Sequence, residues 1–143
     1  MEFLLYLALQ SKQVVYDVMA TKFDVKENVG FCKSPSYFGY VDHNPDVLVI
    51  CTKNILDSGF DPHVYINETV LHEAVHAAQE CNGGNPLGVD LKSMPLPPNK
   101  LSDIKKSLSI SKKTDNSYYR EHEAFYFEDK PERVQHYVKK FCF

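Results

Sequence analysis

The sequence has no strong excess of charge of either sign and no apolar run long enough to cross a membrane. It contains 16 Lys and Arg against 19 Asp and Glu, a formal net charge of −3, which argues against nucleic-acid binding as the main activity. The apolar residues 3–9 follow Glu2, where a signal peptide has Lys or Arg, and they stop at Gln10, far short of the ~20 residues of a membrane span. We therefore expect a chain that stays in the cytoplasm and binds neither membrane nor nucleic acid.

A Cys-x-x-Cys pair is also absent. The chain has 4 cysteines, and they are widely spaced: Cys32, Cys51, Cys81 and Cys142. This spacing excludes a zinc ribbon and a redox dithiol motif. For a cytoplasmic protein we expect reduced thiols that pack as small apolar side chains. The even count leaves disulfide pairing open.

The length and composition fit a single folded domain. A chain of 143 residues can form one core but not two independent ones, and 43% hydrophobic with 24% charged residues is ordinary for a folded protein. We expect one α+β domain over residues 1–143. Apolar residues recur at three- and four-residue steps from residue 2 to about 22, which predicts a first helix that packs on the core.

Two runs rich in β-branched and aromatic residues predict a β-hairpin. Residues 36–42 and 46–52 are separated by the turn sequence His43-Asn44-Pro45. Residues 47–51 are continuously apolar, so we expect that strand to be buried on both faces. In the preceding connector, residues 23–36, we expect one further short strand around Val29–Cys32.

The second half of the chain alternates between helical patterns and breakers. Four prolines between residues 85 and 100 predict a long irregular loop. A short helix at 102–108 and a polar linker at 112–116 follow. From about Ser117 the pattern is helical again, and Pro131 divides it into two helices, because proline fits the first turn of a helix.

The most informative motif is His72-Glu73-Ala74-Val75-His76. On a helix, residues four apart lie on the same face, so both imidazoles can reach one metal ion, and the intervening glutamate can reach a water bound there. This helix can start at Asp61-Pro62 or at Asn67, and we favour the earlier start; Asn82-Gly83-Gly84 predicts its end. The motif predicts a zinc site with His72 and His76 as ligands.

A catalytic zinc needs a third protein ligand from elsewhere. The candidates stand together at the start of a later helix: Glu121, His122 and Glu123. Helical spacing puts Glu121 on one face with Ala124, Phe125 and Glu128, the face that we expect to pack on the first zinc helix. Glu123 points about 200° away, at about 100° per residue. We predict Glu121 as the third ligand, with Glu123 as the fallback.

The two motifs together, H-E-x-x-H at 72–76 and E-x-x-A at 121–124, resemble the pattern of gluzincin metallopeptidases. The resemblance covers residues 46–128 at most, and it departs from the family where Phe125 replaces a frequent Asp. It implies a minimal zincin-like domain: a small sheet or hairpin packed on a zinc-binding helix, with helices at both ends. It also implies a peptide or protein substrate that lies along an edge strand, either Ser36–Asp42 or Asp46–Thr52.

The resemblance implies a zinc-dependent metallopeptidase that hydrolyses peptide bonds through a zinc-activated water, with Glu73 as the general base. Tyr118 and Tyr119 are the candidates for stabilising the oxyanion. The alternative is a catalytically inactive zincin-like structural or interaction protein, whose zinc only stabilises the fold. The third interpretation is that His72 and His76 lie on one face of a helix that binds no metal. The sequence leaves open whether the chain has a protein partner or belongs to a larger assembly.

Overall fold

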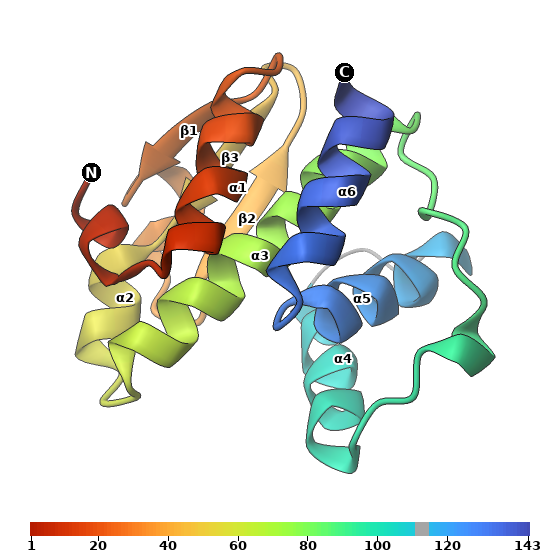
Figure 1. Ribbon diagram of the computed structural model, residues 1–143. Helices are drawn as coiled ribbons and strands as arrows, with labels where there is room; N and C mark the ends of the chain where they lie inside the picture. The colour runs from red at the N-terminus through yellow and green to blue at the C-terminus, as the bar shows by residue number, and fades with distance from the viewer. Residues whose placement is uncertain (111–114) are drawn as a thin grey trace.

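The computed structural model describes residues 1–110 and 115–143 and has the expected α+β composition (Figure 1). In this part of the chain a small mixed sheet packs against helices. The elements in order are η1 (Glu2–Tyr6), α1 (Leu9–Met19), β1 (Asp24–Glu27), η2 (Gly30–Lys33), β2 (Gly39–Asp42), β3 (Val47–Ile50), α2 (Thr52–Asp57), α3 (Pro62–Cys81), η3 (Leu91–Ser93), α4 (Pro98–Ile110), α5 (Asp115–Phe127) and α6 (Pro131–Cys142), where η denotes a 3-10 helix.

The predicted hairpin is confirmed as β2 and β3, which pair antiparallel, with Gly39 opposite Ile50. The strand order is β1-β3-β2, and β1 runs parallel to β3. β3 is the central strand, and its residues Leu48, Val49 and Ile50 are buried, as expected for a strand covered on both faces. The short strand predicted at Val29–Cys32 is wrong. The strand lies at β1 instead, because Asn28 has a φ of 58° and ends the extended chain.

The single helix predicted for residues 2 to 22 is also wrong. Leu7 and Ala8 are extended, with ψ of 137° and 156°, and they separate η1 from α1. The side chain of Asn67, on α3, holds this break: its Oδ1 accepts from Ala8 N and its Nδ2 donates to Tyr6 O. Tertiary hydrogen bonds at one point therefore interrupt a sequence whose local pattern is helical.

The side chain of Glu27, at the end of β1, links η1 to the start of α2. Its carboxylate accepts from the backbone N–H groups of Glu2 and Phe3, at 3.0 and 2.8 Å, and from Thr52 Oγ1 at 2.5 Å. Partial burial would raise the pKa of Glu27, but these donors, Thr52 first, outweigh burial and lower the pKa below 4.5.

Because the folded state prefers ionised Glu27, its stabilisation is complete above pH ~4.5 and is lost as the pH falls through the lowered pKa. We expect Glu27→Gln to reduce the free energy of unfolding by about 1 kcal/mol at pH 7, a value discounted for solvent exposure. Urea titrations of both proteins at pH 7 and pH 3 check this. An equal difference at the two pH values would contradict it.

Helix α3 lies at the centre of the molecule, with the sheet on one side and α4 and α5 on the other (Figure 1). It contacts α1, α2, α5, α6, β2 and β3. Its predicted start is confirmed, since Asp61 Oδ1 accepts from His63 N and Pro62 is the first helical residue. Its predicted end is confirmed at Cys81. The buried side chains along it are mostly small or β-branched, which lets several neighbours approach closely.

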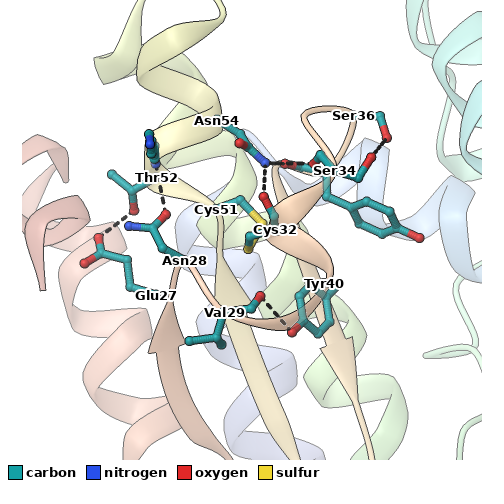
Figure 2. Close-up of a disulfide and its surroundings, with 12 residues drawn as sticks. Glu27, Asn28, Val29, Cys32, Ser34, Ser36, Tyr40, Cys51, Thr52 and Asn54 are labelled. Carbon is teal, nitrogen blue, oxygen red and sulfur yellow. Dashed lines mark hydrogen bonds between the residues drawn. A yellow bond between two sulfur atoms is a disulfide. The ribbon is translucent and has the colours of Figure 1, made fainter.

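The cysteines are paired, so the expectation of reduced thiols is wrong. Cys32 bonds to Cys51 and Cys81 to Cys142, and none is free. Beside the first disulfide, the Nδ2 atom of Asn54 donates to the carbonyls of Cys32, Ser34 and Tyr37 and fixes the loop before β2 (Figure 2). The second disulfide joins the C-terminal ends of α3 and α6. Sequence spacing does not reveal either pair, because the partners are brought together only by the fold.

The predicted loop after α3 is confirmed for residues 85–97, apart from η3. Helix α4 begins at Pro98 and is longer than the segment predicted at 102–108. The linker predicted at 112–116 lies largely outside the described residues. Pro131 opens α6, as predicted. None of the described helices is both long and apolar enough to span a membrane.

Candidate metal centre

The three residues predicted as ligands converge between α3 and α5. Nε2 of His76 lies 2.7 Å from Glu121 Oε1, and Nε2 of His72 lies 3.5 Å from Glu121 Oε2. One candidate ligand atom from each residue lies within 4.8 Å of the other two. Two imidazoles and one carboxylate are a donor set used by catalytic zinc, with room for a fourth ligand. The side chains therefore fit a zinc ion.

Small and flat side chains bring the two helices together. Ala124 is fully buried, and the ring of Phe125 packs edge-on against His72, with centroids 4.6 Å apart. This is the face of α5 that the sequence pattern assigns to the contact with α3. On the other side, Ser107 on α4 donates to Glu121 Oε2 at 3.0 Å. The carboxylate of Glu121 is thus held from two directions.

The charged side chains of the cluster shift one another's pKa values. Burial would raise the pKa of Glu121, but the adjacent His76 and His72 hold it well below its usual value. Burial would lower the pKa of His72, but Glu121 and Glu128 raise it well above its usual value. A metal ion at this position would take the place of protons, since ligands bind metal in their deprotonated form.

Glu73 lies beside the cluster and against the edge of the sheet. Its side chain is buried, and burial raises its pKa, although His72 and His76 act in the opposite direction. A Cβ atom placed on Gly39 of β2 would come within 3.0 Å of Glu73 Cγ and 2.9 Å of Thr69 Cγ2. The edge strand β2 therefore packs closely against α3 at the side chain of Glu73.

Of the two strands considered for substrate binding, only β2 is free on one side within the described sheet. The segment Asp46–Thr52 contains the central strand β3, whose neighbours occupy both edges. The segment Ser36–Asp42 contains β2, which is paired on one side only. A strand with one free edge can accept an extended peptide by main-chain hydrogen bonding.

His72 has a carboxylate behind it that was not predicted as a site residue. Its Nδ1 lies 2.9 Å from Oε1 of Glu128, at the end of α5. Lys100 Nζ is 3.6 Å from Oε2 of the same carboxylate. The side chain of Glu68 forms a hydrogen bond with Glu128. Burial and this bond raise the pKa of Glu68 to about 8, so Glu68 is the protonated member of the Glu68–Glu128 pair at neutral pH. Glu128 could have been found from the sequence, because it follows Glu121 by seven residues and so lies on the same face of the helix.

Behind His76 stands an amide. His76 Nδ1 is 2.7 Å from Gln79 Oε1, and Gln79 Nε2 donates to Glu123 Oε1 at 2.9 Å. Glu123, the fallback ligand, is fully buried and faces Gln79 and the loop after α3. It is not brought to the candidate metal position. Nothing in the sequence distinguishes Gln79 as a partner of His76 apart from its i+3 spacing.

The remaining candidates also contact the loop. His122 is buried, with Nε2 at 2.7 Å from Met94 O. The hydroxyl of Tyr119 donates to Val89 O, and the ring of Tyr118 packs beside His122. The oxyanion role expected for one of these tyrosines therefore has no support in their contacts, because Tyr119 is committed to the loop.

A search among curated proteins and one among solved structures found no match. A family model does match, over residues 3–143, and it is described as a domain of unknown function, DUF8637. The match covers nearly the whole chain, helices α3 and α5 included. The chain belongs to this family.

Proposed function

We propose that this protein is a zinc-dependent metallopeptidase of the gluzincin kind, with His72, His76 and Glu121 as ligands and Glu73 as general base. The observation that supports it most is the convergence of these three ligands beside a buried glutamate under an edge strand. Two distant motifs of the sequence are brought into one site in the arrangement that the resemblance implies.

When bound, zinc supplies Lewis acidity and a water that ionises near neutral pH. The chain supplies the rest. Glu128 and Gln79 hold the rings of His72 and His76 through hydrogen bonds at Nδ1. These bonds keep Nε2 of each ring directed at the site. Glu73, whose pKa is raised by burial, would accept a proton at its carboxylate oxygen and return it to the leaving amine.

The substrate class follows from β2. The outer edge of Gly39–Asp42 offers backbone donors and acceptors to an extended chain, whatever its side chains. We therefore infer an extended peptide or an unfolded protein segment as the substrate. The test is therefore turnover of an unfolded protein by the zinc-loaded chain. Full zinc occupancy without turnover would favour the alternative, an inactive zincin-like protein in which zinc stabilises the fold.

The ligand assignment has its own test. We expect Glu121→Ala to weaken zinc binding by more than about 100-fold, beyond the 10–100-fold that is typical of residues outside the ligand set. Glu123→Ala should have the smaller effect. Competition with a chromogenic chelator measures both constants. If Glu123→Ala loses more affinity than Glu121→Ala, the third ligand is misassigned, and if wild type binds no zinc, the proposed function fails.

The disulfides bear on where such an enzyme would work. Disulfides persist in oxidising compartments and are rare in the cytosol. The pairs Cys32–Cys51 and Cys81–Cys142 therefore favour an oxidising location over the cytoplasmic one expected from the sequence. Counting free thiols in the native protein, with and without reductant, checks the pairing on which this inference depends.

A further inference from the structure

The hydrogen bonds behind His76 converge on the carboxylate of Glu123. From the loop after α3, the N–H groups of Leu87 and Gly88 donate to it, at 2.8 and 3.2 Å. A backbone N–H can only donate, and a carboxylate only accepts. Glu123 is fully buried, so these donors also compensate for its removal from water.

The next member is the amide of Gln79, also fully buried. Its Nε2 lies between two acceptors, Glu123 Oε1 at 2.9 Å and Arg120 O at 3.0 Å. Its Oε1 lies between two ring or guanidinium nitrogens, Nδ1 of His76 at 2.7 Å and Nε of Arg120 at 3.2 Å. Exchanging the amide O and N would place donors against donors and acceptors against acceptors, so only this orientation satisfies every partner.

The Gln79 oxygen that faces Nδ1 favours the neutral tautomer with its proton on Nδ1, whereas without metal the Glu121 carboxylate, 2.7 Å from Nε2, competes for that proton. Where a metal ion or the loss of that carboxylate removes this competition, Gln79 places the proton on Nδ1. The lone pair is then on Nε2, the atom directed at Glu121 and the candidate metal position. If the Gln79 amide were reversed, its NH₂ group would favour an unprotonated Nδ1 and a proton on Nε2, which blocks metal binding there.

We propose that Glu123 is a positioning residue for the metal centre: through Gln79, it fixes the tautomer in which His76 binds zinc. The inference rests on the proposed function for its metal, but the effect of Gln79 on the ring can be measured without zinc once the Glu121 carboxylate is removed. The inference gives the loop a structural role, because two consecutive N–H groups, of Leu87 and Gly88, donate to one carboxylate.

The tautomer is measured from the ring ¹⁵N shifts of His76 in metal-free Glu121→Ala, at a pH at which the ring is neutral, because no carboxylate then competes at Nε2. In this protein we expect the Nδ1–H form, and after the further change Glu123→Ala a substantial population of the Nε2–H form. Zinc affinity, measured by chelator competition, should fall by about 10–100-fold in Glu123→Ala alone. Glu132→Gln removes an exposed carboxylate from α6 and serves as the matched control, with neither property changed.

Gln79→Met gives an independent variant, since it removes the amide but keeps a long side chain in the same space. It should shift the tautomer in the same direction. It replaces Glu123→Ala as the test variant if Glu123→Ala fails to fold. An unchanged tautomer in a folded variant overturns the proposal, even where zinc affinity falls, because that loss would then be merely structural. If Glu121→Ala shows the Nδ1–H form but wild type binds no zinc, the proposed function fails and the positioning role of Glu123 stands.

Discussion

Exchange of Glu73 for glutamine should lower kcat/KM on an unfolded protein substrate by about 10²–10⁴-fold, the range for loss of a general base. The amide has nearly the same shape but does not accept the proton. The side chain is buried between the metal position and β2, so no solvent carboxylate replaces it. Zinc affinity should stay within a few-fold of wild type, since Glu73 is not among the three ligands.

Initial rates at substrate concentrations far below KM, on protein with measured zinc content, give the comparison directly. Glu132→Gln is again the control, as the same chemical change at an exposed position, and should keep wild-type turnover. Activity retained in Glu73→Gln would remove Glu73 from the mechanism. Activity lost together with zinc would mean that the residue supports the metal and not the proton transfer.

Loss of the disulfide between α3 and α6 should have the largest effect on stability. The bridge joins Cys81 to Cys142 across a sequence separation of 61 residues. By the loop-closure estimate, removing it increases the entropy of the unfolded chain and lowers the free energy of unfolding by about 4 kcal/mol. Cys142→Ser is the suitable change, because Cys142 is only partly buried.

Urea unfolding of wild type and Cys142→Ser, each with and without reductant, tests this. The shorter bridge, Cys32–Cys51 with a separation of 19, is expected to contribute about 3 kcal/mol by the same estimate. The matched comparison is therefore the two proteins under reducing conditions, where they should have nearly equal stability. A Cys142→Ser variant as stable as oxidised wild type would contradict the structural role of this pair.

What the sequence predicted well depends on local signals. Helix α3 begins at Asp61-Pro62 and ends before two glycines, and all of these act on their own immediate backbone. The hairpin follows from two β-rich runs and a turn. The face of α5 that carries Glu121 follows from helical geometry alone, which is why the cluster of three candidate ligands could be predicted.

What was missed depends on distant contacts. Asn67 interrupts the first helix from a position 59 residues away in sequence from Ala8. The cysteine pairs become visible only when the fold brings their Cα atoms to 5.2 Å. Glu128 and Gln79, which support the two histidines, look like ordinary polar helix residues until the packing of α3 on α5 is known.

The contact between β2 and α3 has a consequence for how the protein tolerates change. Gly39 lies close to Glu73, and a methyl group there would press on Glu73, on Thr69 and on the carbonyl of Val49. Any residue with a side chain at position 39 would therefore push β2 away from α3. The close approach of the edge strand to the glutamate of the motif depends on the absence of a side chain at this one position.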